Sequence, residues 1–177
     1  MTETITPQKL AHVVFRTERL GDMVDWWTTV LGATVVFSNP FIAFLTYDDE
    51  HHRIAIARVP GLAPKAEQPT IGLEHVAFTY RTLGDLLATY ERLRSKGIVP
   101  YWCINHGPTT SLYYRDPDGN QAELQIDNFP SVEALHAWFR SRAFADNPIG
   151  VMFDPDRLLE RFRRGDPVEE LVQQGSA

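Results

Sequence analysis

The stretch that decides the fold is Leu10-Ala-His12-Val13-Val-Phe15, which recurs as Leu73-Glu-His75-Val76-Ala-Phe78. Each copy is followed, at the same distance, by the tripeptide Leu-Gly-Asp, at residues 20–22 and again at residues 83–85. All seven identities keep a single offset of 63 residues, which chance seldom maintains from one element into the next. The sequence therefore predicts an internal duplication in which His12 and His75 occupy equivalent positions.

Each copy begins with a β-prone run and continues into a helix. Val and Phe around the two histidines favour short strands, and residues 23–31 and 86–93 carry helical apolar spacing. Asp22 and Asp85 are plausible N-caps of these helices. Three further strands fit each half, at 34–37, 42–47 and 53–59 and at 100–104, 110–114 and 121–126. We therefore expect an α+β fold of two tandem βαβββ modules whose strands pair into a curved mixed sheet that forms a cup.

The domain organisation follows from the repeat. We expect one domain over residues 1–128, with module 1 at about 8–60, a proline-rich linker at 61–70 and module 2 at about 71–127. Residues 129–177 lie outside the repeat and predict a helical C-terminal extension, with N-caps at Ser131, Asp154 and Asp166. Whether this extension covers a sheet face, closes a pocket or forms a dimer interface is left open by the sequence.

Composition narrows the class of protein. A net charge of −6 gives no electrostatic case for a nucleic-acid partner. The single cysteine excludes an internal disulfide and any multi-cysteine zinc site. The N-terminal residues lack the apolar core of a secretory signal, and no apolar run reaches the ~18 residues that a membrane span needs. We therefore expect a soluble cytoplasmic domain with neither a nucleic-acid nor a membrane partner.

A carboxylate in module 2 completes a possible metal site. The strand after the turn at residues 116–120 carries Glu123 on the same face as Gln121 and Gln125. A carboxylate on a strand otherwise fit for burial is costly unless it is paired or bound to a metal. If the first strands of the two modules run side by side, His12, His75 and Glu123 converge. Two imidazoles and one carboxylate are the ligand set of non-haem Fe(II) sites with open positions.

Module 1 offers no second acid for this site. Subtracting the offset of 63 from Glu123 gives Pro60 as the equivalent position in module 1, and the neighbouring residues 57–59 hold no carboxylate. The sequence therefore favours an open site with three protein ligands over a closed site with a glutamate from each module.

Four further side chains fit oxygen chemistry. Strand alternation lets one of His51 and His52 face the cup, where it would shuttle protons; the alternative is that both are solvated. His106 and Tyr113 lie shortly before Glu123 and would donate hydrogen bonds to a metal-bound oxygen. Their alternatives are an ordinary loop histidine and a half-buried strand aromatic.

These motifs resemble those of a known family. The paired modules, over residues 8–127, look like the vicinal oxygen chelate superfamily, also called the glyoxalase–bleomycin resistance superfamily. The run Ile104-Asn-His106 … Leu112-Tyr113-x-x-Asp116-Pro117-x-Gly119-x-x-x-Glu123 is similar to the signature of type I extradiol ring-cleavage (catechol) dioxygenases. His51-His52 before an aliphatic strand is also similar to that family, and this chain resembles a short, single-domain form of it.

The resemblance implies a set of roles for the candidate residues. It implies that Fe(II), with Mn(II) as the alternative, is bound by His12, His75 and Glu123. His51 matches the family's acid–base catalyst better than His52 does. The family's pair of hydrogen-bonding residues is matched by His106 and Tyr113.

The resemblance also implies an activity. The enzyme would insert both atoms of O₂ into a catechol-type aromatic diol and cleave the ring next to the diol, acting as a homo-oligomer, dimeric or higher. Two alternatives stay open. One is another metal-dependent enzyme of the same fold, such as an isomerase or epimerase. The other is a non-catalytic dimer that binds a small molecule.

Overall fold

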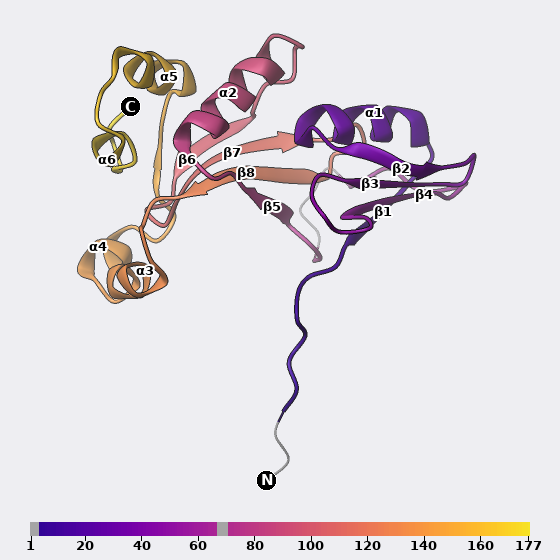
Figure 1. Ribbon diagram of the computed structural model, residues 1–177, viewed down its shortest axis with the longest axis horizontal. Coiled ribbons are helices and arrows are strands. Elements are labelled where there is room, and N and C mark those ends of the chain that lie inside the picture. The colour runs from indigo at the N-terminus through magenta and orange to yellow at the C-terminus, as the bar shows by residue number, and fades with distance from the viewer. Residues whose placement is uncertain (1–3, 67–70) are drawn as a thin grey trace. The chain divides into compact units, whose positions relative to one another are not determined.

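The structure, a computed structural model, describes residues 4–66 and 71–177 and divides into two compact units. Unit 1 comprises Met1–Thr70 together with Asp116–Asp118, and unit 2 comprises Ile71–Arg115 and Gly119–Ala177. Each unit contains one β-sheet and the helix of one module (Figure 1). The end of the expected linker, residues 67–70, lies outside the described residues.

Unit 1 is a βαβββ module. Its elements are β1 (Val13–Thr17), α1 (Leu20–Leu31), β2 (Thr34–Ser38), β3 (Ile42–Thr46) and β4 (Ile54–Arg58). The strand order is β1-β4-β3-β2, with β1 parallel to β4 and the other neighbours antiparallel. Helix α1 contacts β3 and β4 and buries Met23, Trp27 and Val30, which recur at the helical period along one face.

Unit 2 repeats this order and adds a strand. Its elements are β5 (His75–Thr79), α2 (Leu83–Arg94), β6 (Trp102–Asn105), β7 (Thr109–Arg115) and β8 (Gln121–Asp127). The strand order is β5-β8-β7-β6-β9, in which β9 (Val151–Met152) comes from the C-terminal extension and pairs antiparallel with β6. The predicted α+β class and the duplicated βαβββ order are confirmed, with one mixed sheet in each module.

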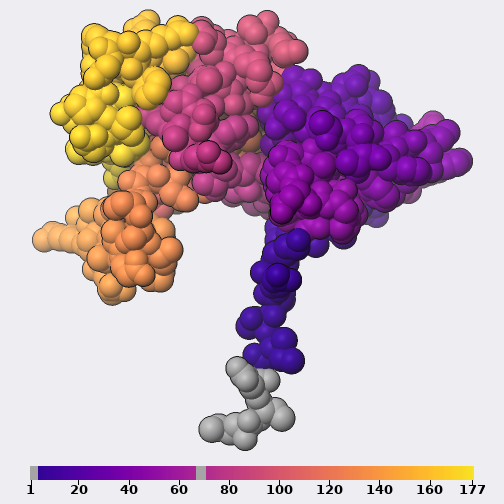
Figure 2. Space-filling view, in the orientation of Figure 1, coloured from indigo at the N-terminus to yellow at the C-terminus, as the bar shows by residue number. Residues whose placement is uncertain are grey.

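The C-terminal extension is helical, as expected, apart from β9. Its helices are α3 (Val132–Phe139), α4 (Arg142–Asp146), α5 (Pro155–Arg164) and α6 (Val168–Leu171). Ser131 and Asp154 cap α3 and α5, since each side chain accepts a hydrogen bond from a backbone N–H of the first turn. Helix α5 packs against α2 in Figure 2, where the yellow residues meet the pink ones. Among the described residues, no helix has the length and apolar character needed to cross a membrane.

Three expected N-caps are wrong. Helices α1 and α2 begin before Asp22 and Asp85, and Thr82 caps α2 by accepting a hydrogen bond from the Asp85 N–H at 3.1 Å. Asp166 does not cap α6; its carboxylate accepts hydrogen bonds from Arg161 and Arg164. Charge-assisted bonds to guanidinium groups are stronger than a bond to a neutral amide, which explains why this carboxylate turns toward the arginines.

The strand register corrects the module 1 position that corresponds to Glu123. The connection between α2 and β6 is five residues longer than the one between α1 and β2, so the repeat offset grows along the module. Ala77 lies opposite Glu123 in the β5–β8 pair, and its repeat equivalent Val14 lies opposite Ala55 in the β1–β4 pair. The counterpart of Glu123 is therefore the buried Ala55 and not Pro60, and module 1 still offers no matching acid.

The single cysteine lies inside the sheet of unit 2. Cys103 is on β6, opposite Leu112 of β7, and its carbonyl accepts a hydrogen bond from the N–H of Phe153 just after β9. Burial raises the pKa of its thiol to about 12, and the negative charges of Asp154 and Asp156 add to the rise. The thiol is therefore protonated at neutral pH.

Candidate active site

Neighbouring parallel strands bring His75 and Glu123 together. His75 opens β5, Glu123 lies near the middle of β8, and His75 Nε2 is 2.9 Å from Glu123 Oε2. Glu123 is only 4 % exposed. A buried carboxylate without a partner is strongly unfavourable, and His75 provides that partner. The polar partner that we expected for Glu123 from its burial is thus present within unit 2, and it is His75.

The same two atoms suit a divalent metal. Imidazole nitrogen and carboxylate oxygen bind such ions at about 2.0–2.2 Å, so two of them at right angles around one ion lie about 3 Å apart. That is close to the 2.9 Å that separates His75 Nε2 from Glu123 Oε2. The third expected ligand, His12, belongs to unit 1. Over residues 4–66 and 71–177, no group of three or more His, Cys, Asp or Glu side chains is arranged to hold an ion.

Strand β7 places Tyr113 beside this pair. Tyr113 lies directly opposite Glu123 in the β7–β8 ladder, and its ring meets that of His75 edge to face, with 5.3 Å between centroids. Burial raises the pKa of the Tyr113 hydroxyl, and the charge of Glu123 and a hydrogen bond to it raise that pKa further. The hydroxyl therefore keeps its proton at neutral pH and acts as a hydrogen-bond donor.

His106 follows β6 and joins the same network. Its Nε2 is 3.0 Å from the Tyr113 hydroxyl, while its Nδ1 contacts the backbone carbonyl of Ile149. Trp102 packs edge-on against the His106 ring and lies tilted on the Tyr113 ring, at 5.6 and 4.8 Å between centroids. The structure thus brings together four of the residues named from the sequence: His75, Glu123, Tyr113 and His106.

The two additional contacts in this network were not assigned to the site from the sequence. Trp102 is an aromatic residue on a strand, and such a residue is equally common in a hydrophobic core and in the wall of a pocket. Ile149 acts through its backbone carbonyl, so its side-chain identity carries no information about the contact with His106. Only the pairing of β9 with β6 reveals it.

Unit 1 gathers three histidines at the amino ends of β1 and β4. His12 precedes β1, and His51 and His52 precede β4, its parallel partner. The ring centroid of His52 lies 4.4 Å from that of His12 and 4.6 Å from that of Phe44, on which it stacks. His51 Nδ1 is 2.6 Å from His52 Nδ1. The structure therefore puts His52 in ring contact with His12, and His51 next to His52.

Electrostatics separate the two neighbouring histidines. Burial lowers the pKa of His52, and positive charge on His12 and His51 lowers it further. The side chain of His51 is 70 % exposed, and its Nε2 is 3.4 Å from the carboxylate of Glu50. Glu50 is buried and also pairs with Lys9, whose hydrogen bond lowers the pKa of that carboxyl. The surroundings of His52 thus favour its neutral form, whereas the side chain of His51 is open to solvent.

The Asp-Pro-x-Gly part of the signature makes structural contacts in unit 1. The Trp27 indole N–H donates to Asp116 Oδ2 at 3.2 Å, and Arg19 pairs with Asp118 at 3.0 Å. Asp116 Oδ1 accepts a hydrogen bond from the Asp118 N–H, which closes the turn. These contacts fix the turn that begins seven residues before Glu123.

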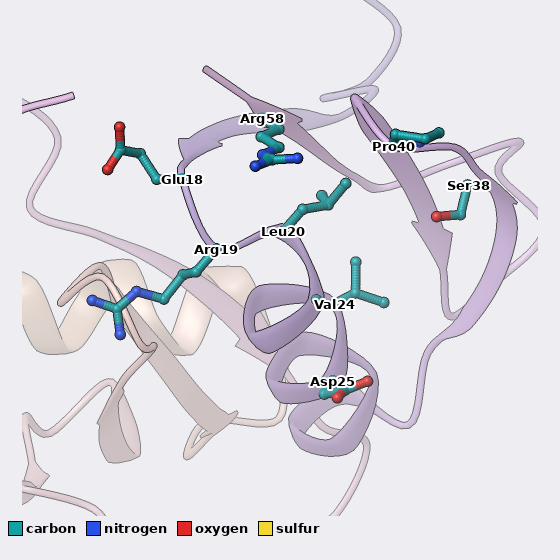
Figure 3. A pocket seen from close by; sticks show the side chains of 9 residues that line it. Glu18, Arg19, Leu20, Val24, Asp25, Ser38, Pro40 and Arg58 are labelled. Carbon is teal, nitrogen blue, oxygen red and sulfur yellow. The ribbon is translucent and has the colours of Figure 1, made fainter. Parts of the chain in front are cut away.

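A groove of about 460 Å³ in unit 1 is separate from these groups (Figure 3). It lies at the carboxyl ends of β1 and β4, where Glu18, Arg19 and Arg58 line it together with the first turns of α1. The three histidines of unit 1 precede the amino ends of the same two strands. The groove is therefore not part of the candidate active site.

Comparison with known proteins gives the family. Residues 9–124 match the Glyoxalase/Bleomycin resistance protein/Dioxygenase superfamily, and this chain belongs to that superfamily. It is 48% identical over 170 residues to Biphenyl-2,3-diol 1,2-dioxygenase 3 of Rhodococcus globerulus, covering 96% of this chain and 89% of that protein. It is 46% identical over 169 residues to Biphenyl-2,3-diol 1,2-dioxygenase 2 of the same organism, covering 96% and 88%. The resemblance to ring-cleavage dioxygenases inferred from the motifs is confirmed.

Solved structures agree on the fold. A glyoxalase/bleomycin resistance protein/dioxygenase from Nocardioides superposes with a TM-score of 0.55 at 23% identity, covering 70% of this chain and 86% of that one. A glyoxalase/dioxygenase from Nostoc punctiforme also has a TM-score of 0.55, at 19% identity, covering 72% and 98%. At these identities the likeness shows the vicinal oxygen chelate fold alone.

Proposed function

We propose that this protein is an extradiol dioxygenase that opens the ring of a catechol-type aromatic diol next to the diol, with both atoms of O₂ entering the product. The observation that carries the proposal is the network of unit 2, in which Glu123 contacts His75 and Tyr113 hydrogen-bonds His106. The relatives named for biphenyl-2,3-diol support a substrate of that class, a diol with an aryl substituent beside it.

The proposed metal ligands are His12, His75 and Glu123. The donor set and the separation of the two donors in unit 2 support this assignment, and Fe(II) is the proposed ion, with Mn(II) as the alternative. When bound, the metal would act as a Lewis acid that lowers the pKa of the diol hydroxyls and would offer open positions to the diol and O₂.

Tyr113 is proposed to orient the substrate. Its hydroxyl is neutral because burial and Glu123 raise its pKa, so the proton that it directs at His106 in the substrate-free protein can turn toward an oxygen of the diol. His106 holds this hydroxyl from the other side at 3.0 Å. Trp102 packs on the rings of both residues.

The acid–base role falls to the histidine pair of unit 1. The 2.6 Å contact between His51 Nδ1 and His52 Nδ1 requires a proton on one of the two nitrogens, so the two rings share a proton that either can carry. Sequence similarity favours His51 as the catalyst, whereas ring contact with His12 favours His52. We assign the role to His51, because its side chain is exposed and therefore open to solvent and substrate.

The test is oxygen uptake by the full chain loaded with Fe(II) under anaerobic conditions. Biphenyl-2,3-diol and unsubstituted catechol are added, and O₂ consumption is followed together with the absorbance of the ring-opened product. We expect one O₂ per diol and loss of both signals in the His12→Ala variant. Metal bound through His12 without O₂ uptake would favour an isomerase or epimerase. No metal binding would favour a small-molecule binding protein.

Self-association and cytoplasmic location are also part of this proposal. We expect a homo-oligomer, as the family resemblance implies. Light scattering on the purified chain gives its mass directly, and a monomeric mass at all concentrations would contradict this expectation.

A further inference from the structure

We propose that the C-terminal extension is a positioning element for His106, in which the backbone carbonyl of Ile149 fixes the imidazole tautomer. The catalytic consequence of this inference rests on the proposed function. The tautomer itself is a property of unit 2 and can be measured in the absence of any activity.

The chemistry of the two contacts determines where the proton lies. A carbonyl oxygen accepts hydrogen bonds and cannot donate one, so His106 Nδ1 must carry a hydrogen to bond Ile149. A neutral imidazole has one N–H and one bare nitrogen, so Nε2 then presents a lone pair. The Tyr113 hydroxyl is 3.0 Å from Nε2 and becomes the donor of that hydrogen bond.

The loop that carries Ile149 is held from both sides. Asn147 Oδ1 accepts a hydrogen bond from the Gly150 N–H, and Asn147 Nδ2 donates to the Gly150 carbonyl, each at 2.9 Å. Directly afterwards, Val151 pairs with Asn105 in the β6–β9 ladder. The carbonyl that meets His106 is therefore fixed by side-chain bonds on one side and by a strand on the other.

Gly150 allows this close approach. Its φ is +117°, a left-handed conformation that residues with a Cβ rarely adopt. A Cβ at this position would lie 2.3 Å from the Asn105 carbonyl oxygen and 2.7 Å from the His106 Cα. Both atoms belong to the backbone and cannot rotate away, so any larger residue must push the Ile149 loop off His106.

Asn105 provides a second attachment next to His106. It is 3 % exposed, and its Nδ2 donates to the carbonyl of Val172 at 2.7 Å, while its Oδ1 accepts from the Gly107 N–H at 2.8 Å. Gln174 Nε2 donates to the Asn105 carbonyl at 3.2 Å. Residues 172–174 of the extension thus hold Asn105, directly before His106, and Asn105 in turn holds Gly107, directly after it.

This arrangement acts on Glu123 through Tyr113. The Tyr113 hydroxyl has one proton and two acceptors, the bare Nε2 of His106 and the carboxylate of Glu123. With Nε2 as an acceptor, the proton has an alternative to Glu123, and the lone pairs of that carboxylate remain available to a metal. With the other tautomer, Nε2–H would point at the hydroxyl oxygen and direct the tyrosine proton onto Glu123.

The experiment is a long-range ¹H–¹⁵N correlation spectrum of the metal-free full chain labelled at histidine. The His106 signals are assigned by their loss in the His106→Gln variant. We expect the pattern of an Nδ1–H tautomer, with ¹⁵N shifts of a protonated Nδ1 and a bare Nε2. An Nε2–H pattern in the unmodified protein would overturn the proposal.

Variants of the loop test the role of the extension. Gly150→Ala and Asn147→Ala should both convert His106 to a mixture of tautomers, and Asn147→Ala does so without adding an atom, which serves if Gly150→Ala does not fold. Ile149→Ala is the matched control, because it keeps the carbonyl and removes a side chain that is 62 % exposed. If both loop variants fold, as judged by circular dichroism, and keep the pure Nδ1–H pattern, the extension does not set the tautomer.

Activity measurements separate this inference from the proposed function. In the Fe(II)-loaded Asn147→Ala variant we expect kcat/KM to fall about 10–100-fold, the range typical of residues that orient a metal ligand, with the fall mainly in kcat. Arg142→Ala, which removes an exposed side chain of α4, should leave both constants unchanged. If the tautomer behaves as expected but no diol consumes O₂, the proposed function fails and the positioning contact stands.

Discussion

The two modules share one strand order but differ in what surrounds their equivalent histidines. In module 1, His12 has imidazoles as neighbours, and the strand position that corresponds to Glu123 is the buried Ala55. In module 2, His75 has a buried carboxylate and the Tyr113 hydroxyl network as neighbours. The duplication thus supplied two equivalent histidines, and later divergence gave neighbouring imidazoles to one module and a buried carboxylate to the other.

The sheet edges differ in the same way. Strand β2 ends the sheet of unit 1, and all five of its residues are exposed. The equivalent strand of unit 2, β6, is covered by β9 of the extension. An added strand satisfies the backbone groups of an edge and stiffens it. The module that holds the hydrogen-bonding network of Tyr113 and His106 is therefore the one in which the extension covers this edge.

Glu123→Gln should have the largest effect of the substitutions that test this difference between the modules, because both metal content and O₂ uptake should fall. The substitution keeps the shape of the side chain but removes the charge that is proposed to bind the metal. Loss of a Lewis acid costs several kcal/mol of transition-state stabilisation, or about 10³-fold or more in rate. Glu50→Gln in module 1 is the control, and it should retain the metal, because Glu50 pairs with Lys9. Equal loss in both variants would contradict the difference between the modules.

His51→Gln should have the next largest effect. A residue that transfers a proton in the rate-limiting step contributes about 10²–10⁴-fold, so kcat should fall by that factor while the metal is retained. His52→Gln should reduce kcat less than tenfold, since the lowered pKa of His52 keeps it neutral. A larger loss in His52→Gln than in His51→Gln would transfer the acid–base role to the residue in contact with His12.

Gly107→Ala should destabilise the protein more than Gly32→Ala does. Both glycines have positive φ, at +96° and +65°, so each alanine costs about 1–2 kcal/mol for the left-handed conformation. Only at Gly107 does a Cβ meet other atoms, 2.2 Å from the Trp138 ring of α3, and overpacking adds about 1–3 kcal/mol. Urea unfolding of both variants measures the difference. Equal destabilisation would mean that α3 does not rest on Gly107.

Tyr90→Phe should have the smallest effect, and one that depends on pH. Tyr90 and Trp27 occupy equivalent repeat positions, and each donates a hydrogen bond to an aspartate, Asp156 at 2.9 Å and Asp116 at 3.2 Å. Burial raises the pKa of Tyr90 to about 12, with Asp156 adding to the rise. Because its folded pKa is above the ordinary 10, its contribution to stability is complete below pH 10 and is lost as the pH rises through 12.

The check is the free energy of unfolding from pH 8 to 12 for the unmodified protein and for Tyr90→Phe. Removal of one neutral hydrogen bond costs about 0.5–1.5 kcal/mol, so the variant should be less stable by that amount at pH 8. The gap should shrink toward pH 12. A gap that stays constant would show that the Tyr90 hydroxyl has the same pKa in the folded and unfolded states.

Much of the fold could be predicted from the sequence because the repeat carries it. Identities at one offset align the first strand and the helix of each module, and apolar periodicity locates the others. The offset of 63 residues fails after α2, because the connection that follows is longer than its counterpart in module 1. The residue that corresponds to Glu123 is therefore Ala55 and not Pro60. Loops change length without disturbing the buried strands. The N-caps failed for a similar reason: a side chain such as Asp166 chooses among partners that only tertiary structure brings near.

The candidate site divides along the same line. Glu123 could be identified because burying an unpaired carboxylate is costly. His75 could be identified because the repeat aligns its strand, and the parallel pairing of β5 with β8 explains why it lies beside Glu123. The contact between Ile149 and His106 had no such signal, because it uses a backbone carbonyl and a two-residue strand too short for any periodicity. Contacts made by the main chain leave the fewest traces in a sequence.

The position of Cys103 gives the protein a built-in reporter. With a pKa of about 12, only about one thiol in 10⁴ is a thiolate at pH 8, and the sheet position between β7 and β9 slows alkylation further. If the extension lifts away from β6, the desolvation and the charges of Asp154 and Asp156 are both removed, and the thiol returns to ordinary reactivity. The rate at which an alkylating reagent modifies the unmodified chain therefore measures how often the C-terminal extension opens, with no label to introduce and no second thiol to confuse the signal.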